Sequence, residues 1–142
     1  MHHTFIHPID VRYLEVDQQG VVFNMWYLAY FDDALTAFLA HRGVPYQDMM
    51  DRGFDVQLVN TDITWRRGVG WGDEVGVAVS TARLGSTSFV LDFSVRVDDE
   101  ECVTGRTVYV VVATDGSGKR PIPDFLREAL EPVEPLLGVL AR

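Results

Sequence analysis

The chain has 142 residues, 47% of them hydrophobic and 23% charged, which predicts one compact domain spanning residues 1–142. Its formal net charge of -9 argues against broad nucleic-acid binding, which needs basic surface to neutralise phosphates. The longest apolar run, residues 25–31, is far shorter than the roughly 18 residues of a membrane helix. Cys102, the single cysteine, excludes an internal disulfide and fits a reducing compartment. Because no secretory leader is visible either, we expect a soluble cytoplasmic protein.

The first third of the chain predicts a strand, a polar loop and a long helix. The strand is expected over residues 5–14, and the loop over residues 15–23 carries acid, amide and glycine residues. Residues 24–42 contain no Pro or Gly, begin with Asn24, and end before Gly43. Asn is a favourable N-cap and Gly a favourable C-terminal stop, so this pattern predicts a helix.

The remaining two thirds of the chain show the two-residue alternation of half-buried strands. The alternation begins after Gly53 and changes phase near residues 59–60, which predicts a β-bulge. A short helix is expected between Pro123 and Pro132. Further strands are expected at residues 75–80, 89–97 and 108–112, with short turns at residues 84–86 and 98–100.

The order of these elements predicts the fold class. Strands joined by short turns must be antiparallel neighbours, and the long apolar helix needs a cover. We therefore expect an α+β fold in which a curved antiparallel five-stranded sheet wraps around the long helix. Such a sheet leaves an edge strand exposed, and edge pairing in a homodimer removes that liability.

The loop before the long helix carries a recognisable motif, Tyr13-x-Glu15-x-Asp17-x-x-Gly20-Val21-Val22-Phe23. With the aromatic-rich helix, the strand order and the ending at residues 119–126, it resembles the 4-hydroxybenzoyl-CoA thioesterase-like branch of the hotdog superfamily over nearly the whole chain. The resemblance implies a hotdog fold and hydrolysis of an acyl-CoA thioester. The chain departs from the family pattern at Asn24, where many members have His or Tyr, and at Val16, where the commonest bacterial relatives have Thr.

The resemblance places the family's catalytic carboxylate at Asp17. A carboxylate either attacks the thioester carbonyl, giving a mixed anhydride, or deprotonates the attacking water. The backbone N–H of Asn24 would then polarise the carbonyl oxygen while its side chain caps the helix. On spacing alone, the favoured interpretation of Asp17 is a turn residue hydrogen-bonded to Gln19 or Gly20, and the family resemblance reverses this preference.

Binding of the substrate requires groups for the coenzyme phosphates and for the acyl chain. Arg and Lys side chains suit phosphates, and Lys119 and Arg120 rank highest because a glycine-rich loop also presents backbone amides. The aromatic candidates are by default core residues, with lining of an acyl pocket as the alternative. The candidates are Gly20, Phe23, Trp26, Tyr27, Arg66, Arg67, Arg83, Ser86, Lys119 and Arg120.

Three further carboxylates lie near the predicted site. Glu15 is interpreted as a solvated strand end in preference to a residue that orders the loop. Asp32 and Asp33 are interpreted as a solvated helix face, although another hotdog thioesterase branch places its carboxylate in this helix. The hotdog dehydratases pair a loop histidine with a helix acid, and no histidine lies between His7 and His41, so dehydration is disfavoured.

The leading hypothesis is an acyl-CoA thioesterase that needs no metal and no cofactor beyond the coenzyme A of its substrate. We expect a homodimer or a dimer of dimers that binds neither nucleic acid nor membrane. One alternative is a thioesterase for acyl groups on an acidic carrier protein, which the net acidity of the chain makes less favourable. The other is a non-catalytic hotdog dimer that binds acyl-CoA.

Overall fold

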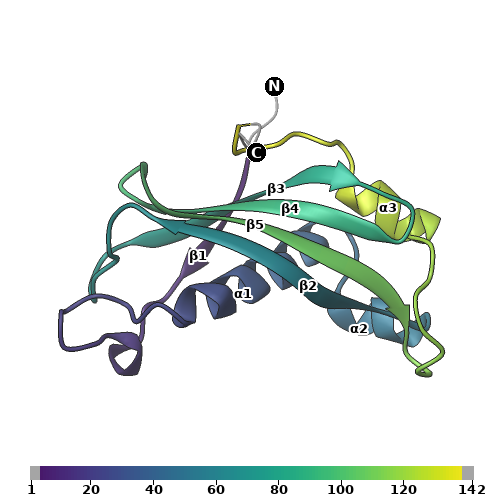
Figure 1. The fold of residues 1–142 in the computed structure, drawn as a ribbon, viewed down its shortest axis with the longest axis horizontal. Helices are drawn as coiled ribbons and strands as arrows, with labels where there is room; N and C mark the ends of the chain where they lie inside the picture. Colours follow the sequence, from purple (N-terminus) through teal and green to yellow (C-terminus); the bar gives the residue numbers. More distant parts are fainter. Residues whose placement is uncertain (1–3, 139–142) are drawn as a thin grey trace.

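The structure, a computed structural model, describes residues 4–138 and consists of an antiparallel sheet that arches over a long helix (Figure 1). The strands are β1 (Phe5–Ile9), β2 (Phe54–Trp65), β3 (Val75–Leu84), β4 (Ser88–Val97) and β5 (Glu100–Ala113), in the order β1-β3-β4-β5-β2. The helices are α1 (Trp26–His41), α2 (Tyr46–Asp51), α3 (Asp124–Leu130) and the 3-10 turn η1 (Tyr13–Glu15). The predicted α+β arrangement of five antiparallel strands around one long helix is confirmed. Among the described residues, no helix is long and apolar enough to cross a membrane.

The core lies between α1 and the sheet, where alternate residues of β4 face the helix. Phe31 of α1 stacks on Phe93 of β4 with ring centroids 4.6 Å apart. Gly105 of β5 lies directly beneath the Phe31 ring, because a Cβ at this position would collide with it. This close approach fixes the position of α1 along the sheet.

Several local predictions are confirmed. The register of β2 against β5 shifts between Leu58 and Asn60, where the change of phase predicts a bulge. Tight turns join β3 to β4 and β4 to β5. The second turn contains Asp98 and Asp99 with φ values of 51° and 64°, as in the type I′ turns that match the twist of antiparallel strands.

The first strand and the start of α1 differ from the prediction. β1 ends at Ile9 instead of residue 14, because the chain turns away from the sheet into η1. The helix begins at Trp26, two residues after the predicted cap, and no side chain caps it. The predicted capping role of the Asn24 side chain is therefore wrong.

Helix α2 was not predicted from the sequence. It spans only six residues after Pro45, and helices of this length depend on tertiary packing rather than on local propensity. Its Met49 is fully buried in the core. Because α2 depends on this burial, the local sequence pattern does not predict the helix.

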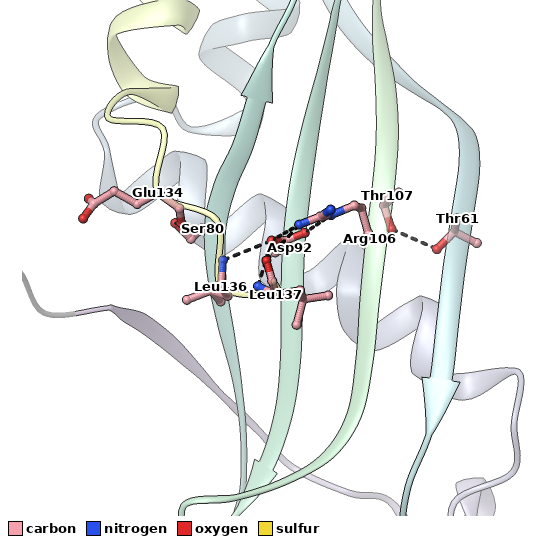
Figure 2. A network of polar contacts seen from close by, with 8 residues as sticks. All are labelled: Thr61, Ser80, Asp92, Arg106, Thr107, Glu134, Leu136 and Leu137. Atoms are coloured by element: carbon pink, nitrogen blue, oxygen red, sulfur yellow. Dashed lines mark hydrogen bonds and ion pairs between the residues drawn. The ribbon is translucent and has the colours of Figure 1, made fainter. Parts of the chain in front are cut away.

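The C-terminal segment, residues 131–137, crosses the outer face of the sheet and is held there by a buried ion pair (Figure 2). Asp92 of β4 is fully buried and accepts bonds of 2.7 and 2.8 Å from the Arg106 guanidinium of β5. The same carboxylate accepts the backbone N–H groups of Leu136 and Leu137, both at 3.0 Å. The alternation of β4 predicts a polar face open to water, but this segment covers it.

Candidate active site

Asp17 lies on a short hairpin between η1 and α1. The Asp17 N–H donates to the Val21 carbonyl (2.9 Å), and the Phe23 N–H donates to the Glu15 carbonyl (2.8 Å). The Gly20 N–H closes the turn by donating to the Asp17 carbonyl (3.0 Å). Gly20 has a φ of 79°, a conformation that side chains with a Cβ rarely adopt. The hairpin therefore holds Asp17 in a defined position just before the helix.

The Asp17 carboxylate combines a turn contact with one available oxygen. Its Oδ1 accepts a hydrogen bond from the Gln19 N–H (2.8 Å), which is the turn interaction expected from spacing alone. Its Oδ2 accepts no hydrogen bond from any described residue, and the side chain is half-buried. The turn contact and a chemically available oxygen therefore exist together.

Asn24 leaves a backbone donor free at the entrance to α1. The neighbouring Phe23 and Trp26 N–H groups donate to backbone carbonyls. The Asn24 N–H has no acceptor within residues 4–138, and the residue is exposed. Such an unpaired N–H is suited to bind an oxyanion.

Glu15 orders the hairpin, so its interpretation as a solvated strand end is wrong. The residue is 4% exposed, and it accepts bonds from the Tyr30 hydroxyl (2.8 Å) and from the Arg12 N–H and Nε (both 2.9 Å). Burial alone would raise the pKa of Glu15, but these hydrogen bonds hold the pKa below its usual value. The sequence did not indicate that Tyr30 is the partner of Glu15, because an inward helical tyrosine has the same pattern in any core.

The loop between β2 and β3 is hydrogen-bonded to the hairpin and to α1. The Val22 N–H donates to the Val69 carbonyl (2.8 Å), and the Val69 N–H donates to the Tyr27 hydroxyl (3.3 Å). Tyr27 is 1% exposed, so its place is in the core. Burial and then the nearby charges of Cys102 and Asp17 raise the pKa of Tyr27.

The exposed aromatic candidates lie closer to solvent than Tyr27. Phe23, on the hairpin, is 47% exposed. Trp26, in the first turn of α1, is half-buried and lines a cavity of about 440 Å³ between α1 and β1. These two side chains, unlike that of Tyr27, are accessible from solvent.

Two of the basic candidates lie near the hairpin but already carry ion pairs. Arg67 Nη1 lies 2.6 Å from Glu100 Oε1, and Arg66 Nε lies 3.6 Å from Glu101 Oε1. Both arginines follow the end of β2. Because these pairs are exposed, they are weak, and a phosphate can compete for the guanidinium groups.

Lys119 and Arg120 lie at the opposite end of the sheet from the hairpin. Lys119 pairs with Val112 near the end of β5, and the Ile122 N–H donates to the Ser86 carbonyl. Arg120 belongs to this same end, whereas Arg83 pairs in register with Val90 of β4 and lines a separate cavity with Arg106 and Leu137. The intervening strand β2 has 12 residues, which corresponds to roughly 35 Å. Within one chain, Lys119 and Arg120 are therefore not brought together with Asp17.

Asp32 and Asp33 are both exposed, as expected for a solvated helix face. Asp33 lines the cavity beside Trp26, whereas Asp32 lines a separate cavity of about 270 Å³ between α1, α2 and β2. Burial, followed by the charge of Asp33, raises the pKa of Asp32. No group of three or more His, Cys, Asp or Glu side chains suited to a metal ion occurs between residues 4 and 138.

Comparison with known proteins places this geometry in a family. A family model described as "Thioesterase-like superfamily" matches residues 11–130, which include the hairpin, α1 and strands β2 to β5. A hypothetical protein from Aquifex aeolicus superposes with a TM-score of 0.85 at 28% identity, covering 89% of this chain and 99% of that one. A hypothetical protein from Thermus thermophilus gives 0.83 at 29% identity, covering 90% and 97%. A thioesterase from Thermus thermophilus, complexed with coenzyme A and Zn, gives 0.73 at 26% identity, covering 88% and 90%.

Proposed function

Because the chain belongs to the thioesterase-like superfamily, we propose that its hairpin hydrolyses the thioester of an acyl-CoA to a free acid and coenzyme A. The protein is a thioester hydrolase, and a solved thioesterase of similar fold is complexed with coenzyme A. The observation that carries the proposal is the pairing of two unused groups on one hairpin. Asp17 offers a carboxylate oxygen, and Asn24 offers a backbone N–H.

In the proposed mechanism, Asp17 acts on the carbonyl carbon and Asn24 on the carbonyl oxygen. As a base, Asp17 takes a proton from water, the resulting hydroxide adds to the carbonyl, and the coenzyme thiolate leaves with that proton. As a nucleophile, Asp17 displaces the thiolate to form a mixed anhydride, which water then hydrolyses. In both routes the Asn24 N–H stabilises the oxyanion, an interaction of about 3 kcal/mol for a good donor.

We further propose a homodimer in which the partner subunit supplies part of the coenzyme site. Strand β2 is an edge of the sheet, and its Leu58 and Val59 are 42% and 54% exposed. Two-fold pairing of β2 with its copy is antiparallel. This arrangement puts the end of one chain that carries Lys119 and Arg120 beside the Asp17 hairpin of the other.

A thiol-release assay over short, long, branched and aromatic acyl-CoA esters tests the function. Asp17→Asn keeps the turn contact to Gln19 but removes the charge, so we expect kcat/KM to fall at least a hundredfold with little change in stability. Equal activity of both proteins would reject the role of Asp17. Absence of turnover on every ester, with acyl-CoA still bound, would favour the non-catalytic alternative, and turnover only of carrier-bound esters would favour the carrier-protein alternative.

A further inference from the structure

The outer face of the sheet carries a cavity with an apolar floor. Val90 of β4 and Val108 of β5 form the floor, Pro135 and Leu137 of the C-terminal segment form a wall, and the volume is about 460 Å³. The cavity lies beside the Asp92 ion pair that holds the segment (Figure 2). Helix α1 and the hairpin before it lie under the opposite, inner face of the sheet (Figure 1). The outer cavity is therefore separate from the proposed hydrolytic site.

A row of residues that line the outer cavity crosses the sheet. The register pairs Val90 with Arg83 of β3 on one side and with Val108 on the other. Val108 pairs in turn with Asn60 of β2. Because neighbouring strands lie about 4.8 Å apart, the row from Arg83 to Asn60 spans about 14 Å. It offers a polar group at each end and an apolar surface between them.

A β-bulge in β3 brings Arg83 to this cavity. The register of β3 against β4 shifts between Thr81 and Arg83, which leaves Ala82 without a paired residue. Val79 is buried in the core, so strict alternation would also turn Arg83 inward. The bulge instead places Arg83 on the outer cavity, and the bulge of β2 lies at the other end of the row, beside Asn60. Bulges that re-aim side chains are frequent next to functional sites.

The charges around the outer cavity favour an anion at one end only. Arg83 is exposed, and its guanidinium forms no ion pair or hydrogen bond within residues 4–138. Arg106 also lines the cavity, but Asp92 neutralises its charge through a 2.7 Å contact. Asp62, which pairs in register with Arg106, contributes a carboxylate on the β2 side. A carboxylate on a ligand is therefore favoured at Arg83 and disfavoured beside β2.

We propose that the outer cavity binds an amphipathic monocarboxylic acid, with its carboxylate on Arg83 and its hydrocarbon chain over Val90 and Val108. The chain runs toward β2 and contacts Leu137. A second carboxylate at the far end of the chain would meet Asp62, so the site discriminates against dicarboxylic acids. The free acid released by the proposed hydrolysis belongs to this class of ligand, but binding in the outer cavity does not depend on hydrolysis.

Occupation of the outer cavity should also hold the C-terminal segment on the sheet. The ligand touches Pro135 and Leu137 on one side and the strands on the other, so it bridges them. A ligand that binds only when the segment is in place stabilises that arrangement by mass action. The free acid is then a signal that tightens the outer face of the sheet.

A binding experiment tests the ligand class. NMR titration measures the Kd values of octanoate, octanol and octanedioate, which share one chain length and differ in their charged groups. We expect octanoate to bind at least tenfold more tightly than the other two, with shifts of the Val90, Val108 and Leu137 methyl signals. Arg83→Gln should lower the affinity for octanoate at least fivefold. Arg52→Gln, the same change at an exposed arginine that follows α2, should leave it unchanged.

Equal affinity for octanoate and octanol would overturn the inference, as would a preference unaffected by Arg83→Gln or shifts confined to the hairpin before α1. Octanedioate bound as tightly as octanoate would overturn the proposed orientation of the ligand. Each comparison is a ratio within one folded variant, so a general loss of stability does not imitate the expected result.

Limited proteolysis tests the link to the C-terminal segment. Saturating octanoate should slow cleavage within residues 131–137 at least threefold in wild-type protein and in Arg52→Gln, but not in Arg83→Gln. Cleavage at an unchanged rate in wild-type protein would refute the bridging role. Neither experiment uses turnover, so a failure of thiol release would reject the proposed function alone, and a failure of octanoate binding would reject this inference alone.

Discussion

Two carboxylates separated by one residue have opposite surroundings on the same hairpin. Glu15 is buried and accepts bonds from Arg12 and Tyr30 on both of its oxygens. Asp17 is half-buried and keeps one oxygen free. A carboxylate whose oxygens are all bonded holds structure, whereas one with a free oxygen can react. This difference supports the proposal that Glu15 positions the hairpin and that Asp17 acts on the thioester.

Glu15 should make the hairpin sensitive to acid. Its pKa is below the usual value, so its ionised form stabilises the folded state above the unfolded pKa of about 4.3. That contribution is lost as the pH falls through the lower, folded pKa. We expect Glu15→Gln to reduce stability at pH 7 by about 1–3 kcal/mol and to flatten the decline in Tm below about pH 4.3.

Urea unfolding at pH 7 and thermal unfolding between pH 7 and pH 3 measure these effects. Asp17→Asn serves as the matched control, because it removes a charge from the same hairpin without losing a buried bond. If both variants lose the same stability, Glu15 does not order the hairpin. An acid dependence that persists unchanged in Glu15→Gln would contradict the assignment of that dependence to this residue.

At the scale of elements, the C-terminal segment acts as a cover for the outer face of the sheet. It joins β3 through a bridge between Thr81 and Val133, and the Thr81 hydroxyl donates to the Leu130 carbonyl at 2.5 Å. Figure 2 shows the segment reaching Asp92, which links it to β4 and β5. Two strands and the segment thus share one buried carboxylate.

Removal of the Asp92 charge should loosen this cover. Asp92→Asn leaves the Arg106 guanidinium without its ion pair and weakens the acceptor for two backbone N–H groups. Breaking a buried pair by removing one partner costs about 3–5 kcal/mol. We expect a loss of this size in urea unfolding, with faster proteolysis of residues 131–137. Asp99→Asn, at an exposed turn position, should change neither the free energy of unfolding nor the rate of proteolysis. An equal effect in both variants would contradict the role of Asp92 in holding the C-terminal segment on the sheet.

At the scale of the whole molecule, the two ends of the sheet carry different chemistry. The Asp17 hairpin lies beyond one end of β2, and the loop with Lys119 and Arg120 lies beyond the other. One chain cannot use both in a single small site. Antiparallel pairing of the β2 edges is the simplest arrangement that brings them together.

Disruption of the β2 edge should therefore affect assembly and catalysis together. Val59→Lys places a charge on the exposed edge, which natural sheets use to prevent edge pairing. We expect wild-type protein to have twice the monomer mass by light scattering, and Val59→Lys to be monomeric with at least tenfold lower kcat/KM. Val133→Lys, on the similarly exposed C-terminal segment, should remain dimeric and active. A fully active monomer would refute the shared site.

The start of α1 shows why part of the site was not predictable. Asn24 has the residue type of an N-cap, but the hairpin bond from Phe23 to Glu15 delays the helix until Trp26. The role of Glu15 depends on Tyr30, fifteen residues away. A sequence pattern records spacing along the chain, and neither contact has a fixed spacing. The prediction of Asp17 came from the family motif and not from such contacts.

The sequence by itself determined the order of the strands and of helices α1 and α3, the bulge of β2 and the tight turns, because these depend on alternation, turn residues and helix breakers among close neighbours. It also marked the hairpin, through the Gly20 turn and the surrounding motif. Only the tertiary structure decided which carboxylates are buried, where the cavity beside Asp32 lies, and which basic residues lie far from Asp17. Those properties arise from packing between distant segments, so the same local pattern is compatible with either outcome.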